Sequence, residues 1–141
     1  MLLQDLEKIQ RCLFKLIDIE LKVDKSEKAK QIAEIAQNMV HLFGLWQYGA
    51  VTPYLQIVLY EKDAEQSIKQ IKAIFDAAYK SWNMDMTPLF YRTAQEEFTG
   101  MEKYFVPAFI SELKSNSEYD FLRTNKAFEN LLVDYNKTSN V

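Results

Sequence analysis

Hydrophobic residues recur at intervals of three and four along most of the chain, which is the spacing of an amphipathic helix. The pattern covers residues 2–23 and continues in a second segment that ends at Phe43. Asp24, with Glu27 three positions later, predicts a capping box for this second helix, and Ser26 is the rival cap. The predicted inward positions are Leu2, Leu6, Ile9, Leu13, Leu16 and Ile17 in the first helix, and Ile32, Ala33, Ala36, Met39, Val40 and Phe43 in the second.

A third helix is predicted from Pro53 to about Tyr60. Thr52 suits its N-cap and Pro53 its first position, where the missing N–H of proline costs nothing. Gly44 and Gly49 both disfavour helix and mark a turn before it. A short apolar run of this kind also suits a buried strand, but the proline start and the helical neighbours favour a helix.

Two more helices are predicted on either side of residue 85. Asp63 and Gln66 form the capping box of a fourth helix, and Thr87-Pro88 repeats the Thr-Pro start signal for a fifth, which runs through Phe98. The predicted inward residues of the fourth helix are Ile68, Ile71, Phe75, Ala78, Tyr79 and Trp82.

The last third of the chain predicts two helices joined by a polar loop, "KSNSEYD". The sixth helix covers about residues 102–114, and Pro107 must lie in its first turn or kink it. Thr124 or Asn125 caps the last helix. Its inward residues are Ala127, Phe128, Leu131, Leu132 and Tyr135.

Composition supports an all-α protein of six or seven helices packed as antiparallel pairs. Three glycines and three prolines in 141 residues are few for a chain rich in β turns. The length suits a single domain, predicted over residues 1–136, with residues 137–141 as a frayed tail. Alternating pairs of amphipathic helices at a period in the thirties are typical of helical solenoids.

Charge and candidate chemistry narrow the function classes. The net charge of −3, without a basic cluster, argues against direct nucleic-acid binding. No apolar run is long enough for a membrane span and no signal peptide begins the chain, so we expect a cytoplasmic location. The lone Cys12 is expected to be a buried, inert thiol.

Catalytic and metal motifs are lacking in the sequence. His41 is the one histidine, and it has no Cys pair or His-Glu-x-x-His companion, so a structural or surface role is expected. Glu96 and Glu97 point about 100° apart on a helix, which suits a solvated face better than a paired-carboxylate site. We therefore predict a non-enzyme with no cofactor and no metal.

Two segments carry a family resemblance. "YLQIVLYEKDAEQSIKQIKAIF" (54–75) resembles a tetratricopeptide unit, in which an apolar helix ends in tyrosine and an acidic turn leads to a second amphipathic helix. "YDFLRTNKAFENLL" (119–132) is similar to the closing segment of such repeat proteins. The resemblance implies a right-handed superhelix that serves as a peptide- or protein-binding scaffold.

The aromatic residues are the remaining candidates for a binding site. Tyrosine and tryptophan are common interface anchors, and several cluster in the middle of the chain. We predict a non-catalytic interaction or regulatory module that binds a protein or peptide partner in an aromatic groove. The alternatives are a helical bundle that senses a small molecule in an apolar pocket, or a bundle that forms homo-oligomers. The predicted partner-binding residues are Trp46, Tyr48, Tyr54, Trp82 and Tyr91.

Overall fold

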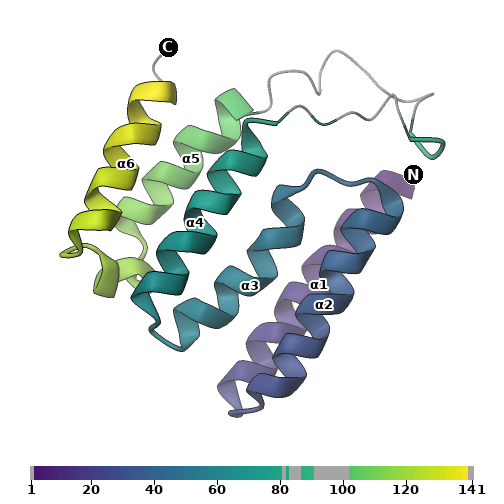
Figure 1. Ribbon diagram of the computed structural model, residues 1–141. Coiled ribbons are helices and arrows are strands. Elements are labelled where there is room, and N and C mark those ends of the chain that lie inside the picture. Colours follow the sequence, from purple (N-terminus) through teal and green to yellow (C-terminus); the bar gives the residue numbers. More distant parts are fainter. Residues whose placement is uncertain (1, 81, 83–86, 91–101, 140–141) are drawn as a thin grey trace.

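The computed structural model of the protein describes residues 2–80, 82, 87–90 and 102–139, and these residues contain helices and no strand (Figure 1). The all-α prediction is confirmed. The predicted fifth helix lies for the most part outside the described residues. In chain order the elements are α1 (Leu2–Lys22), α2 (Ser26–Phe43), α3 (Tyr48–Tyr60), α4 (Ala64–Ala78), α5 (Glu102–Ser115), the 3₁₀ helix η3 (Ser117–Leu122) and α6 (Lys126–Ser139).

The helices follow one another across the molecule in sequence order, from α1 at one end to α6 at the other (Figure 1). Each of α1 to α4 packs against the next helix, α1 also reaches α3, and α4 contacts both α5 and α6. None of the described helices is long and apolar enough to cross a membrane.

Small residues on α2 allow the first three helices to approach closely. Ala29 and Ala33 are fully buried and pack in one cluster with Ile17 of α1 and Ile57 of α3. Helices α3 to α6 share a larger cluster in which Phe75, Leu113 and the other members interdigitate. Burial of such apolar area is the main force that holds the array together.

The turn between α1 and α2 differs from the predicted capping box. Asp24 adopts a left-handed conformation, with φ of 59°, and its N–H donates to the carbonyl of Leu21. The N–H of Lys25 donates to the carbonyl of Glu20 at 2.8 Å. The prediction of Asp24 as an N-cap is wrong because this residue closes the C-terminus of α1, and α2 begins at Ser26 without a side-chain cap.

Helix α3 begins at Tyr48, five positions before the predicted start. Thr52 does not cap it: the Thr52 hydroxyl donates to the Tyr48 carbonyl at 3.0 Å inside the helix, and Pro53 is also internal. Gly49 is helical and not part of the turn. A β-carbon there would lie 2.9 Å from Gln10 Nε2, so glycine serves the close packing of α3 on α1. Gly44 alone makes the turn, as the left-handed C-cap of α2.

The later caps agree better with the sequence. The Asp63 carboxylate accepts from the Gln66 N–H at 3.1 Å, as predicted for α4. Asn125, rather than Thr124, caps α6 and accepts from the N–H of Ala127 at 2.9 Å. Residues 114–120 are predicted as a plain polar loop, but the 3₁₀ helix η3 forms within this segment and buries Tyr119 and Leu122. Helix α6 continues through residues 137–139, which were predicted as frayed tail.

Several positions predicted to face the core are exposed. Leu2, Ile9 and Leu16 of α1 point to solvent, whereas Leu6 and Ile17 are buried. Cys12 is exposed as well, so the expectation of a buried thiol is wrong. Ala127 at the start of α6 is also exposed. Helix α1 thus carries two apolar faces, one buried and one exposed. Residues of both faces recur at intervals of three and four, so the sequence pattern alone does not distinguish the two faces.

Candidate functional site

A groove runs along one face of α1, and we call it the α1 groove. It consists of two hollows, of about 550 Å³ and 320 Å³, and Phe14 lines both. The α1 residues that line it, from Leu3 to Leu21, are spaced as one face of the helix. Its opposite wall comes from the segment around α3 and from η3.

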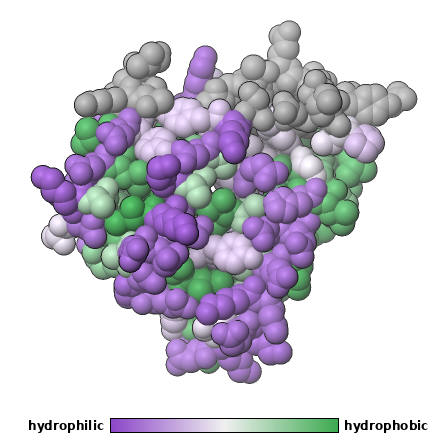
Figure 2. All heavy atoms as spheres, in the orientation of Figure 1, coloured by the Kyte–Doolittle hydropathy of each residue, from purple (hydrophilic) through white to green (hydrophobic). Residues whose placement is uncertain are grey.

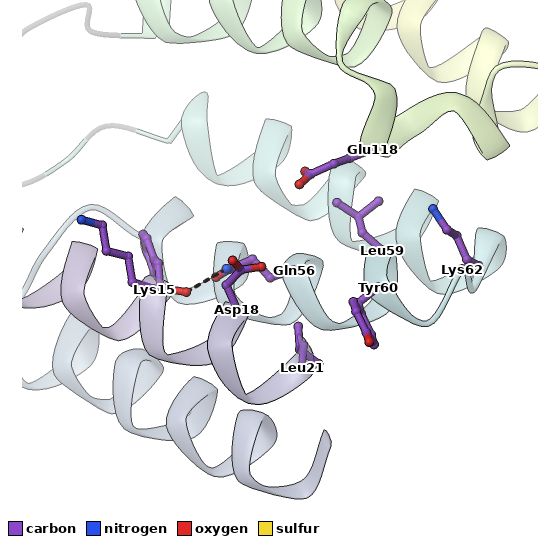
Figure 3. Close-up of a pocket in the computed structure, with 9 residues that line it drawn as sticks. Lys15, Asp18, Leu21, Gln56, Leu59, Tyr60, Lys62 and Glu118 are labelled. Atoms are coloured by element: carbon purple, nitrogen blue, oxygen red, sulfur yellow. Dashed lines mark hydrogen bonds between the residues drawn. The ribbon is translucent and has the colours of Figure 1, made fainter. Parts of the chain in front are cut away.

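The larger hollow has an apolar floor and a charged rim (Figure 3). Leu21 and Leu59 belong to the floor, and Gln56 Nε2 donates to the Phe14 carbonyl at 3.0 Å. This bond ties α1 to α3 along the bottom of the groove. The residues around the hollow are Phe14, Lys15, Asp18, Leu21, Gln56, Leu59, Tyr60, Lys62 and Glu118.

Both signs of charge are present on the rim of the larger hollow. The Asp18 carboxylate accepts from Lys22 Nζ at 2.9 Å, and this hydrogen bond, with the charge of Asp18, raises the pKa of Lys22. Lys62 Nζ lies 5.0 Å from the ring centroid of Phe121, in a cation–π contact. Asp18 and Lys62 therefore each have an interaction partner at the edge of the groove.

The smaller hollow is backed by a cluster of four aromatic rings, which we call the aromatic wall: Trp46, Tyr48, Trp82 and Phe105. The Trp46 ring stacks parallel to Trp82, with 6.5 Å between centroids, and meets Tyr48 edge to face at 4.9 Å. Phe105 of α5 lies 4.7 Å from Tyr48. Aromatic contacts of this kind fix ring orientation and add stability beyond burial.

Burial controls the chemistry of the aromatic wall. Trp46 is 8% exposed, and its indole Nε1 has no hydrogen-bond partner among the described residues. Tyr48 is half-buried, and this burial, together with the charge of Glu7, raises the pKa of its hydroxyl. The wall therefore presents neutral, apolar surface, with Glu7 and Arg11 of α1 across the hollow.

The structure brings together three of the five predicted partner-binding residues. Trp46, Tyr48 and Trp82 all line the smaller hollow. Tyr54 lies elsewhere: its hydroxyl donates to Gln37 Oε1 at 3.2 Å on the side of α3 that packs against α2. Tyr91 lies outside the described residues.

Sequence reasoning missed the α1 side of the groove. Phe14, Gln10 and Arg11 have no motif, and their role follows from the packing of α1 beside α3, which periodicity does not predict. The position of Phe14 could have indicated this side of the groove, because it is an aromatic residue outside the predicted inward stripe of its helix.

The residues considered for catalysis do not gather in this groove. His41 is exposed near the end of α2, while Glu96 and Glu97 lie outside the described residues. Among the residues that the structure describes, no group of three or more His, Cys, Asp or Glu side chains is placed to hold a metal ion.

Comparison with known protein families, with curated proteins and with solved structures finds no significant match to this chain.

Proposed function

We propose that this protein is a non-catalytic interaction module that binds an extended peptide segment of a partner protein in the α1 groove. The observation that carries the proposal is the continuity of the groove: two hollows share Phe14 and follow one face of α1. From Leu3 to Leu21 this face is about 27 Å long at 1.5 Å per residue. An extended peptide of about eight residues matches that length.

The two hollows suit different parts of such a peptide. The aromatic wall offers rigid apolar surface for a hydrophobic anchor, because its rings are held by their mutual contacts. The larger hollow offers cations at Lys15 and Lys62 and anions at Asp18 and Glu118. We expect the preferred peptide to carry an apolar residue at one end and charged residues of both signs at the other.

The array of helices supports a tetratricopeptide-like interpretation of the fold. Helices α1 and α2, α3 and α4, and α5 and α6 are consecutive pairs that lie side by side in sequence order (Figure 1). Repeat proteins of this architecture stack such pairs into a superhelix and bind partners along its extended inner surface. Under this proposal the α1 groove is part of that surface.

Selection from a displayed library of random peptides about ten residues long tests the proposal, since such peptides slightly exceed the groove in length. Selected peptides are then titrated against the protein by calorimetry. Phe14→Ala removes the side chain common to both hollows and is expected to weaken binding by about 10- to 30-fold, the effect of losing an interface anchor.

Tyr104→Ala is the matched control. Tyr104 is also aromatic, is 82% exposed on α5 and does not line the groove, so its loss should leave the affinity unchanged. Circular dichroism must show that both variants remain folded. The proposal fails if no peptide is enriched, or if Phe14→Ala binds the selected peptides as tightly as the parent.

A further inference from the structure

A second apolar face of α1 is exposed on the side away from the groove. Leu2, Ile9, Leu16 and Val23 are spaced seven residues apart, with Val23 in the turn just after the helix. Cys12 and Ile19 fall between them, which completes the spacing of a helix–helix seam. The five aliphatic side chains are each 46–56% exposed.

Helix α2 extends this face. Ile35 and Leu42 are also seven residues apart, and Leu42 is 77% exposed. Both lie on the flank of α2 opposite to Gln37, which accepts a hydrogen bond from Tyr54 of α3. They therefore lie on the flank toward α1. In Figure 2, hydrophobic residues reach the surface along the edge that α1 and α2 form in Figure 1.

We propose that a second copy of this chain docks on the face formed by these residues of α1 and α2, which we call the outer face. The two copies pair their α1–α2 hairpins as a four-helix bundle, with α1 of each copy against α2 of the other. A twofold arrangement of this kind uses the same surface on both copies.

Complementary rows of charge border the outer face and select this arrangement. Lys8, Lys15 and Lys22 lie along α1 on the side of the seam away from α2. Glu27 and Glu34 lie along α2, beyond Ile35 and Leu42, and are exposed. In a bundle where α1 faces the α2 of the second copy, the lysine row of one copy meets the glutamate row of the other.

The heights of these charges along the hairpin agree. Helix α1 ends at Lys22 and α2 begins at Ser26, so positions equally far from the turn lie at equal heights. Lys22 is then level with Glu27, and Lys15 is level with Glu34. If α1 of one copy packed directly on α1 of the other, the two lysine rows would face each other. Repulsion between these like charges disfavours that alternative.

The size of the outer face meets the requirement of a stable dimer. A hairpin about 30 Å long and two helices, or about 20 Å, wide buries roughly 600 Å² on each copy, near the lower limit of specific interfaces. The charged residues within the face, Asp5 and Lys28, stand near its two ends, and the polar residues that share the stripe of Ile35 and Leu42 on α2, Gln31 and Asn38, are uncharged.

Sedimentation equilibrium of the full chain tests the proposal. The expected mass is twice the chain mass of 16.6 kDa. The double variant Ile9→Glu, Leu16→Glu places charges in the seam and should yield a folded monomer, because both side chains are already solvent-exposed. Val133→Glu, at an exposed position of α6, is the matched control and should remain dimeric.

Charge exchange distinguishes this arrangement from other dimers. Lys15→Glu and Glu34→Lys should each weaken the dimer, and the combined variant should restore it, since Lys15 and Glu34 then exchange signs across the interface. The thiol of Cys12 gives a second readout: its reaction with a thiol reagent should slow as protein concentration rises. A monomer at all concentrations, or a thiol rate independent of concentration, overturns the proposal. A dimer that the seam variant leaves intact, or that double charge exchange fails to restore, also overturns it.

Discussion

The indole Nε1 of Trp82 donates a hydrogen bond of 2.9 Å to the carbonyl oxygen of Gly44. The carbonyls at the end of a helix lack intrahelical partners, and Gly44 is the C-cap of α2. The bond therefore joins the residues after α4 to the end of α2. The same bond holds Trp82 parallel to Trp46, so the place of Trp82 in the aromatic wall depends on a helix cap 38 residues earlier in the chain.

Trp82→Phe is expected to lower the free energy of unfolding by about 1–3 kcal/mol beyond the loss of ring area, because the Gly44 carbonyl loses its donor. Trp46→Phe is the comparison, since the Nε1 of Trp46 has no described partner to lose. Urea unfolding followed by circular dichroism measures both variants. Equal losses would show that the bond to Gly44 contributes nothing.

Gly44→Ala tests the same helix cap through its backbone conformation. The φ of Gly44 is +64°, and a left-handed conformation costs an alanine about 1–2 kcal/mol. An added β-carbon would also lie 2.5 Å from Thr87 Cγ2, so the total cost should exceed this strain.

Thr87→Ser separates the two contributions to the cost of Gly44→Ala. Serine lacks Cγ2 but keeps the hydroxyl oxygen, which accepts from the Phe90 N–H at 3.2 Å. In the Thr87→Ser background, Gly44→Ala should cost only the backbone strain, and urea midpoints give the difference. If the cost is the same in both backgrounds, the methyl contact is irrelevant.

Local sequence signals predicted the helices better than their boundaries. Asp63 caps α4 as expected because nothing else competes for it. Asp24 has the same chemistry, yet it takes the left-handed position that ends α1, which Lys62 occupies in the equally short connection between α3 and α4. Lys25 therefore stands at the N-cap of α2, where its side chain makes no cap hydrogen bond. Thr52-Pro53 does not mark the start of α3. The helix already begins at Tyr48, which packs in the aromatic wall, so Thr52 and Pro53 lie inside it.

The candidate site was predictable on one side only. Trp46 and Tyr48 drew attention as aromatics beside glycines, and they do form the wall. Helix α1 has three apolar faces: one buried in the core, one exposed to solvent, and one with Phe14 that lines the groove. A single sequence gives no rule that tells these faces apart. Tyr54 lies outside the groove, because it is on the flank of α3 that packs against α2, and a single sequence does not show which neighbour covers each flank.

The contact between Tyr135 and Asp76 predicts how stability depends on pH. The Tyr135 hydroxyl donates to the Asp76 carboxylate and joins α6 to α4. Burial raises the pKa of Asp76, but the hydrogen bonds from Tyr135 and Lys72 outweigh it and leave that pKa below 3.8. Burial and the same hydrogen bond raise the pKa of Tyr135 above 10.0.

The two shifts have opposite consequences at the two ends of the pH range. A lowered acid pKa gives stability that is present above pH 3.8 and lost as the pH falls below it. A raised tyrosine pKa gives stability that is present below pH 10.0 and lost as the pH rises further. Tyr135→Phe should therefore destabilise most between these limits, by about 1 kcal/mol or less since Asp76 is exposed.

Chemical unfolding of Tyr135→Phe across this pH range checks the shape of the curve. Tyr60→Phe is the matched control, because it removes a hydroxyl whose bond to the exposed Asp24 is long, at 3.4 Å. A difference between the parent and Tyr135→Phe that stays constant at acid and alkaline pH would contradict the coupling.

Gly49→Ala should separate stability from binding. Alanine favours helix over glycine by about 1 kcal/mol, which offsets the crowding at this position. The added β-carbon meets the flexible end of Gln10 at 2.9 Å and Val40 Cγ2 at 3.4 Å, and the Gln10 side chain can move aside. We therefore expect the unfolding midpoint to change little. Gln10 lines the smaller hollow, so its displacement should weaken binding of selected peptides.

Gln10→Ala in the Gly49→Ala background should then restore the affinity, because the side chain that moved into the hollow is gone. Calorimetric titration of the single and double variants gives the comparison. If Gly49→Ala lowers the unfolding midpoint strongly and Gln10→Ala does not relieve it, the contact with the Val40 side chain limits the approach of α3 to α2. Glycine would then serve that packing and not the shape of the groove.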